Sequence, residues 1–174
     1  MPLIRPLAAA DSLADLTSLL HRAYGRLAAM GLNYTAADQT PEVTAQRIAG
    51  GQCFVAELGG RLVGTVLVHP TYARNVCAWF TRPGVAAVHQ FAVEPALQGR
   101  GVGRALLAAC EAWARRESFS ELAMDTAEPA THLVALYTRL GWRPVGHVQW
   151  PGKVYRSVVL SKALNPVLPA EPAR

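Results

Sequence analysis

Long apolar runs are the first feature that this sequence lacks. Nowhere in its 174 residues does it approach the roughly 18 uninterrupted apolar residues that a membrane helix needs. The first residues, Met1 to Arg5, lead into a polar helix start and not into the apolar stretch of a secretion signal. We therefore expect a cytoplasmic protein with no membrane partner.

Cysteine is also scarce. Cys53, Cys77 and Cys110 are an odd number of thiols at wide spacings, without the close cysteine pair or histidine cluster that a metal site needs. Free cysteine is among the residues most often buried in folded proteins. The sequence therefore predicts reduced, mostly buried thiols and no metal.

Blocks of basic residues are missing, although the chain as a whole is basic. A net charge of +5 and a pI near 9.5 favour polyanionic partners such as nucleic acid or a phosphate-bearing cofactor. The arginines are scattered, however, and no run of five or six basic residues occurs. We therefore expect no nucleic-acid partner, and Arg100 and Arg104, which flank a glycine-rich turn, become the basic residues of interest.

What is present is the composition of one globular domain. Hydrophobic residues make up 51% of the chain and charged residues 17%, and the length suits a single core. There is no internal repeat and no Gly/Ser linker, and only the end of the chain is rich in proline. We predict one domain over residues 1–163 and a loosely held tail over residues 164–174.

Helical and β patterns alternate along this domain. Apolar spacing and capping residues predict helices after Ser12, from Pro41 to Gly50, from Val102 and from Leu133 to Leu140. After one strand near the amino terminus, β-rich runs predict strands at residues 53–58, 62–69, 85–93, 121–125, 143–150 and 154–161. Residues 70–84 form an irregular insert between two of these strands.

The order of these elements predicts the fold class. The hairpins make most neighbouring strands antiparallel, while the strand, helix, strand order after residue 85 implies a parallel pair joined by a right-handed crossover. We therefore expect an α/β (α+β) fold. It is a mixed, mostly antiparallel seven-stranded sheet with a central parallel pair and helices on both faces.

A glycine-rich turn lies between a buried strand and an amphipathic helix. Its residues are Gln98, Gly99, Arg100, Gly101, Val102, Gly103 and Arg104. Glycines let several unsatisfied backbone N–H groups at a helix start point toward one anion, such as a pyrophosphate. A tight strand-to-helix turn with no ligand is the plain alternative. A P-loop is excluded because Gly-Lys-Ser/Thr is absent, and too few strand-helix units follow for a dinucleotide fold.

Three segments together resemble the GNAT superfamily of acyl-CoA-dependent N-acyltransferases. Residues 98–103 match its Gln/Arg-X-X-Gly-X-Gly/Ala motif, residues 91–95 are similar to its central strand, and residues 136–142 are similar to its later Leu-Tyr-X-X-X-Gly-Phe segment. The resemblance covers residues 3 to 162 and leaves the insert at 70–84 unaccounted for.

The resemblance implies acetyl-CoA as co-substrate. Main-chain amides from Gln98 through Arg104 would bind its pyrophosphate, and the backbone of Phe91, Ala92 and Val93 would pair with the pantetheine arm. Many relatives carry asparagine seven residues before the tyrosine of the later segment, where this chain has Ala130. One side-chain contact to the coenzyme is therefore missing.

Three side chains are candidates for the chemistry. The resemblance places Tyr137 at the position of the general acid, where a phenol can protonate the departing thiolate. Asp125, at a position that carries a glutamate base in some relatives, and His89 are alternative bases for the amine. His89 shares strand parity with Phe91 and Val93, so we expect its side chain on their face, and an ordinary imidazole pKa near 6.5 suits proton removal. Without the motif, Tyr137 and His89 read as core residues and Asp125 as a turn cap.

The acceptor pocket is the least defined part of the prediction. By family resemblance it lies between the early helices and the last hairpin, where Tyr34, Trp150 and Tyr155 are the candidate substrate-binding residues. Asp38, Glu94 and Asp125 would give the pocket negative charge if they converge.

The sequence therefore predicts an N-acetyltransferase that moves an acetyl group from acetyl-CoA to a primary amine by direct attack in a ternary complex. A non-catalytic coenzyme A-binding sensor or interaction module is the alternative. Exposed edges of the closing hairpin also suggest a possible homodimer.

Overall fold

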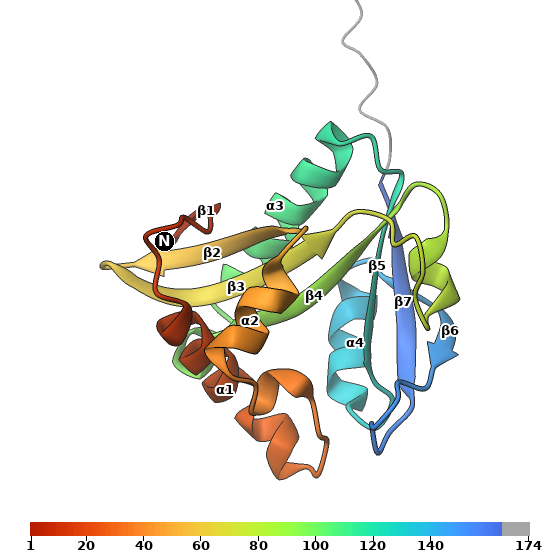
Figure 1. The fold of residues 1–174 in the computed structure, drawn as a ribbon, viewed down its shortest axis with the longest axis horizontal. Coiled ribbons are helices and arrows are strands. Elements are labelled where there is room, and N and C mark those ends of the chain that lie inside the picture. The colour runs from red at the N-terminus through yellow and green to blue at the C-terminus, as the bar shows by residue number, and fades with distance from the viewer. Residues whose placement is uncertain (165–174) are drawn as a thin grey trace, which may run out of the picture.

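Seven strands form one mixed sheet in the computed structural model, which describes residues 1–164 (Figure 1). The strands lie in the order β1-β2-β3-β4-β5-β7-β6, and only β4 and β5 are parallel neighbours. Their bounds are β1 (Leu3–Pro6), β2 (Gln52–Leu58), β3 (Arg61–His69), β4 (Val85–Val93), β5 (Glu121–Ala127), β6 (Arg143–Val148) and β7 (Ser157–Ala163). This arrangement confirms the predicted fold class. Apart from residue 164, the predicted tail lies outside the described residues.

Helices cover both faces of the sheet. α1 (Leu13–Ala29) and α2 (Pro41–Ile48) lie on one face, and α3 (Val102–Arg116) and α4 (Thr131–Arg139) pack on the other (Figure 1). The hydroxyls of Ser12 and Thr40 accept hydrogen bonds from backbone N–H groups in the first turns of α1 and α2. These caps lie directly before Leu13 and Pro41, where the two helices were predicted to begin, and their side chains satisfy donors that a helix start leaves free.

The main core lies between the sheet and α3 and α4. Leu106 of α3, Leu122 of β5 and Leu160 of β7 are completely shielded from solvent there. Burying each such leucine contributes about 1.5 to 3 kcal/mol to folding. A second cluster on the face of α1 includes Phe80 from η2 (Ala78–Thr81), so the insert at 70–84 packs against the sheet.

Several strand boundaries differ from the prediction. β5 continues to Ala127 because it pairs with β7 as far as Ala127 opposite Ser157, so Asp125 lies inside the strand instead of at its predicted end, where it could have capped a turn. β6 ends at Val148 and β7 begins at Ser157, and residues 149–156 form a longer connection than the predicted turn.

A β-bulge at Gln90 changes the direction of β4 side chains. Gln90 has a φ of 48°, and the pairing of β3 with β4 shifts between Thr65 and Leu67. His89 therefore contacts Tyr72 on the face of α1, whereas Phe91 packs beside Tyr137 on the face of α4. The predicted common face for His89, Phe91 and Val93 is wrong, because the bulge interrupts the strict alternation that the prediction assumed.

The remaining structural predictions concern single residues and the surface. All three cysteines are buried and free of disulfides. Within residues 1–164 there is no cluster of three metal-binding side chains, and no helix has the length and apolar character to cross a membrane. Cytoplasmic location and a homodimer stay predictions.

Candidate functional site

Two cavities meet where β4 and β5 separate. The strands pair only from Val85 to Ala87 on β4, so their later residues diverge. The β4–β5 cavity, of about 350 Å³, lies between these strands, the glycine-rich turn, α1 and α4. The α2 cavity, of about 560 Å³, lies between α2, the insert and residues 149–156. The side chains that line both are Tyr24, Tyr34, Val88, His89, Gln90 and Asp125.

The glycine-rich turn presents a run of free main-chain donors. Within residues 1–164, none of the backbone amides from Gly99 to Arg104 donates to a protein acceptor. Gly99 and Gly101 have φ angles of 76° and 85°, in the left-handed region that other L-residues avoid. Gly101 caps α3 without any side-chain hydrogen bond. The turn and helix start are thus open to an anion such as a pyrophosphate.

Close packing fixes this turn against β4. A Cβ atom at Gly103 would lie 2.9 Å from Cζ of Phe91, so any other residue there would require the Phe91 ring or α3 to shift. The Gln98 side-chain amide donates to the carbonyl oxygen of Val93 over 3.1 Å. These two contacts hold the free amides at the open end of the β4–β5 cavity.

The predicted coenzyme-binding residues divide into three groups. Those that line the β4–β5 cavity are Phe91, Ala92, Val93, Gln98, Gly99, Gly101, Gly103 and Arg104. Val102 turns its side chain into the main core, and Arg100 is exposed outside the cavity. Ala130, at the position of the family asparagine, is the fully buried N-cap residue of α4 and offers no polar side chain.

The edge of β4 offers another free donor. The N–H of Glu94 donates to the carbonyl of Val63 on the β3 side, over 2.9 Å. Because backbone N–H groups alternate along a strand, the N–H of Val93 points to the opposite side, where β5 no longer pairs. The Tyr24 hydroxyl donates to the carbonyl of Phe91 over 3.3 Å. This open edge fits an extended ligand that binds as an extra strand.

Tyr137 of α4 lies at the inner wall of the β4–β5 cavity. It is only 7% exposed, and its ring centroid is 6.3 Å from that of Phe91. Burial raises the pKa of Tyr137 well above its usual value, and the nearby ionisable groups Tyr24, Tyr34 and Asp125 raise it further. The phenol therefore keeps its proton at neutral pH, although burial makes it a weaker acid than an exposed tyrosine.

Asp125 of β5 faces both cavities. Its Oδ2 accepts a hydrogen bond of 2.8 Å from the indole N–H of Trp150. Burial raises the pKa of Asp125, against the opposing effect of that hydrogen bond. The carboxylate is therefore a stronger base than an ordinary exposed aspartate.

His89 lies in an aromatic cluster on the face of the sheet that α1 covers. Its Nε2 is 3.0 Å from the hydroxyl of Tyr72, and its ring meets those of Tyr72, Phe80 and His69 edge-on. Burial, helped by the positive charge of Arg47 and by His69, lowers the pKa of His89 to about 3. The expected pKa near 6.5 is wrong, because a charged imidazole would be poorly solvated here.

The three predicted substrate-binding residues surround the junction of the cavities. Tyr34 and Tyr155 have ring centroids 5.1 Å apart, and both line the α2 cavity with Trp150. The N–H of Ala127 donates to the Tyr34 hydroxyl over 2.7 Å, which ties the segment after α1 to the end of β5. Tyr34 and Trp150 are thus held by the fold rather than free in solvent.

The acidic pocket considered in the sequence analysis does not form. Asp38 is exposed, and Glu94 pairs with Arg22 over 2.8 Å outside both cavities. The charged side chains that join Asp125 in the α2 cavity are instead Arg47 and Lys153. Sequence reasoning missed both of them, together with Tyr24 and Tyr72, because no local motif marks any of the four.

Comparisons with known proteins agree with this geometry. The model of the acetyltransferase (GNAT) family matches residues 14–142. The S-(2-succino)cysteine N-acetyltransferase of Bacillus subtilis (strain 168) is 27% identical over 158 residues, covering 90% of this chain and 91% of that protein.

Solved structures share the fold at low sequence identity. The ribosomal-protein-S18-alanine N-acetyltransferase of Escherichia coli superposes with a TM-score of 0.71 at 16% identity, covering 100% of this chain and 99% of the other. A GNAT family acetyltransferase of Elizabethkingia anophelis with acetyl-CoA bound gives 0.66 at 18% identity, covering 93% and 97% of the two chains. The chain therefore belongs to the acetyltransferase (GNAT) family.

Proposed function

We propose that this protein transfers the acetyl group of acetyl-CoA directly to a primary amine while both substrates are bound. The observation that carries the proposal is the junction of two cavities at Asp125: one has a main-chain cradle for a phosphate-bearing coenzyme, and the other has a polar lining for an acceptor. Tyr137 lines the first cavity near this junction.

Main-chain groups bind the coenzyme in this proposal. The free amides from Gly99 through Arg104 bind the pyrophosphate, and Arg104 adds a positive charge beside it. The N–H of Gln98, also predicted to bind there, donates instead to the carbonyl of Pro95 over 3.3 Å. The open edge from Phe91 to Val93 pairs with the pantetheine arm. When bound, acetyl-CoA supplies the acetyl group as a reactive thioester.

Two donors assist the transfer. The Val93 N–H donates to the thioester oxygen as negative charge develops on it, a role that a preorganised backbone group can fill. A bond forms between the amine nitrogen and the acetyl carbon, and the bond from that carbon to sulfur breaks. Tyr137 gives its proton to the departing sulfur, so coenzyme A leaves as a thiol.

Asp125 accepts the proton that the amine loses, directly or through a water molecule. Of the two bases predicted from the sequence, it is the stronger in this structure, because burial raises the pKa of its carboxyl and lowers the pKa of His89 to about 3. His89 then serves to orient Tyr72, with which it shares a hydrogen bond.

The test combines binding with turnover. Calorimetry measures acetyl-CoA binding, and thiol release with mass analysis of the product follows acetylation across a panel of primary amines. Because the curated relative is an S-(2-succino)cysteine N-acetyltransferase, that compound is the first acceptor in the panel. Tight coenzyme binding with an acetylated amine product supports the proposal. Tight binding with no turnover for any amine would favour the alternative, a coenzyme A-binding module without catalysis.

A further inference from the structure

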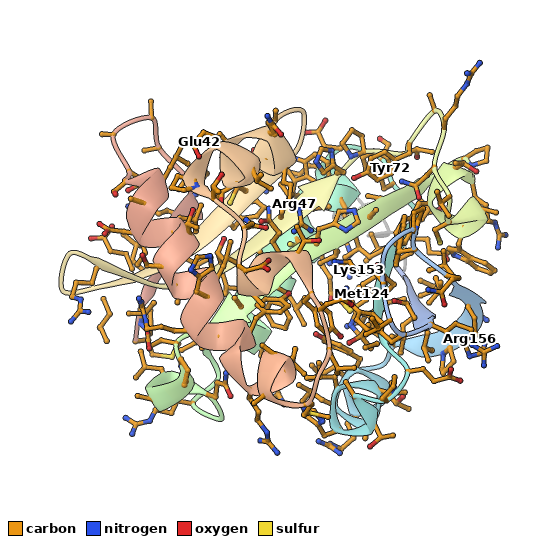
Figure 2. All side chains as sticks on the ribbon, turned by 60° about the horizontal axis from the view of Figure 1, so that its bottom comes forward. Glu42, Arg47, Tyr72, Met124, Lys153 and Arg156 are labelled. Atoms are coloured by element: carbon orange, nitrogen blue, oxygen red, sulfur yellow. The ribbon has the colours of Figure 1, made fainter. Side chains whose placement is uncertain are left out.

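Two positive side chains face the α2 cavity without a negative partner. Arg47 comes from the last turn of α2, and Lys153 comes from the connection between β6 and β7 (Figure 2). Among residues 1–164, neither has a carboxylate within salt-bridge distance. By contrast, Arg5, Arg22, Arg115, Arg156 and Lys162 all form such pairs.

Arg47 is held in place by neutral groups. Its Nη1 donates to Oε1 of Gln39 over 2.8 Å, and the amide of Gln39 donates in turn to Oε1 of Gln90 over 2.8 Å. Both glutamines are buried, with 4% and 5% of their surface exposed. A guanidinium has five N–H donors, and within residues 1–164 this is the one hydrogen bond that Arg47 donates. The remaining donors are available to a ligand in the cavity.

Lys153 is also held by neutral oxygens. Its Nζ donates to the backbone carbonyl of Asn33 over 2.6 Å and to the hydroxyl of Thr35 over 2.9 Å. An ammonium group has three donors, so one remains after these two bonds. The chain has only two lysines, and the other, Lys162, is paired with Glu111.

Burial in the cavity disfavours the positive charges of Arg47 and Lys153. Burial lowers the pKa of Arg47, and burial together with the charge of Arg47 lowers the pKa of Lys153. Asp125, which also lines the cavity, accepts a hydrogen bond from Trp150, and its charge opposes the effect of burial on the pKa of Arg47 without forming a salt bridge among residues 1–164. An anionic ligand in the cavity would therefore stabilise the positive charges of Arg47 and Lys153.

We propose that the acceptor is an amine that carries a carboxylate, of the amino acid or small acidic peptide class, and that Arg47 and Lys153 bind this carboxylate while the amine lies at Asp125. This inference rests on the proposed acetyl transfer and adds the substrate class. It follows from the arrangement of charge in one cavity: two cations on the α2 side, and one carboxylate at the junction with the β4–β5 cavity.

Matched acceptors test the class directly. We would compare kcat/KM for L-methionine with that for L-methioninamide, and for L-glutamate with that for its α-carboxamide. The carboxamides keep the amine and remove the α-carboxylate. They also have more of the amine uncharged at neutral pH, so any preference for the acid reflects carboxylate binding and not amine basicity. We expect the acid to be favoured by about tenfold or more in at least one pair.

Variants then assign that preference to the two cations. Arg47→Met and Lys153→Met should each remove most of it by raising KM for the acid, and leave KM for the carboxamide little changed. Arg47→Lys should restore part of it. The control is Arg156→Gln, which removes a cation from the same connection as Lys153 but outside both cavities, where Arg156 pairs with Glu128. This control should keep the preference, and thermal unfolding verifies that each variant is folded.

The outcomes separate the two proposals. If carboxamides are acetylated as well as or better than the acids, the acceptor class is wrong. If both Lys153→Met and Arg47→Met keep the preference for the acid, the assignment of carboxylate binding to these two cations is wrong. Acetyl transfer stands in either case. If acetyl-CoA binds but no amine of either kind is acetylated, the proposed function fails and the acceptor class fails with it.

Discussion

The two cavities that meet between β4 and β5 are built in opposite ways. The β4–β5 cavity takes its binding groups from the main chain, mostly from residues 91–93 and the glycine-rich turn. The α2 cavity takes them from side chains on α2, β3, β4, β5, the insert and the connection before β7.

Because of this difference, the two cavities should tolerate different substitutions. Main-chain donors survive a change of side chain unless the new residue disturbs the backbone, so the coenzyme side depends on its glycines. Side-chain donors are lost with a single substitution, so under the proposed function the α2 cavity can change its ligand without disturbing coenzyme binding. Single substitutions in each cavity test this difference.

The largest effect is expected at the glycine-rich turn. Gly101→Glu places a carboxylate beside the pyrophosphate site and forces a left-handed φ of 85° on a residue that avoids it. We expect acetyl-CoA affinity to fall by about 100-fold or more, since repulsion between like charges adds to a distorted cradle. Calorimetry measures the loss.

The matched control for this variant is Gly60→Glu in the turn between β2 and β3. Gly60 has a φ of 75°, and at Gly60, as at Gly101, a Cβ atom would meet nothing within 4 Å beyond the adjoining residues. The control variant suffers the same backbone strain far from both cavities. Equal loss of affinity in the two variants would show that strain, and not the anion site, causes the effect.

Tyr137→Phe should act on turnover and not on binding. Removing the phenolic proton leaves the departing sulfur without its acid, and we expect kcat to fall by about 100-fold. Acetyl-CoA affinity should change little, because the ring still packs beside Phe91. Steady-state kinetics and calorimetry on the same preparation separate the two quantities. An unchanged kcat would remove Tyr137 from the chemistry.

Asp125→Asn should slow turnover and yet stabilise the fold at neutral pH. We expect kcat to fall by about 10- to 100-fold, because an amide cannot accept the proton from the amine. Because the pKa of Asp125 is raised, this residue binds more protons in the folded protein than in the unfolded chain. This holds at pH values between the unfolded pKa of 3.8 and the folded pKa. The free energy of unfolding therefore falls as pH rises through that window and stays lower above it.

Thermal unfolding at two pH values measures this second effect. The melting temperature of Asp125→Asn should match that of the wild type near pH 3.5 and exceed it near pH 8, where the wild-type carboxylate is ionised. A variant less stable than the wild type at pH 8 would mean that the hydrogen bond from Trp150 outweighs the cost of burying the charge.

The smallest effect is expected at His89. With a pKa of about 3 it is uncharged at neutral pH, and His89→Gln keeps a polar group for the Tyr72 hydroxyl. We expect kcat to fall by much less than in Asp125→Asn, with no change in the pH at which activity declines. A loss as large as that of Asp125→Asn would instead make His89 the base.

The sequence was most informative where a structure depends on neighbouring residues. The helix caps at Ser12 and Thr40, the glycine turn and the order of helices and strands along the chain all follow from short-range rules. Candidate coenzyme-binding residues could be named for the same reason, because most of them belong to one run of residues around Gly101, and most of that run lines the β4–β5 cavity.

The acceptor side was not predictable in this way. Arg47 looks like an ordinary basic residue in the last turn of a helix, and Lys153 like part of an exposed turn, until the fold brings both to one cavity. The pKa of His89 likewise depends on burial by the insert, whose packing no periodic pattern indicates. These properties belong to the tertiary structure.

The bulge at Gln90 reverses the alternation of β4 side chains between the two faces of the sheet. Before it, odd-numbered residues such as His89 face the α2 cavity, and after it, odd-numbered residues such as Phe91 face the helix that carries Tyr137. In the proposed function, one strand thereby serves both substrates, one with each half. Deleting a single residue here would restore regular alternation and move the side chains of the second half of β4 to the opposite face of the sheet. α3 would then face side chains that now point away from it.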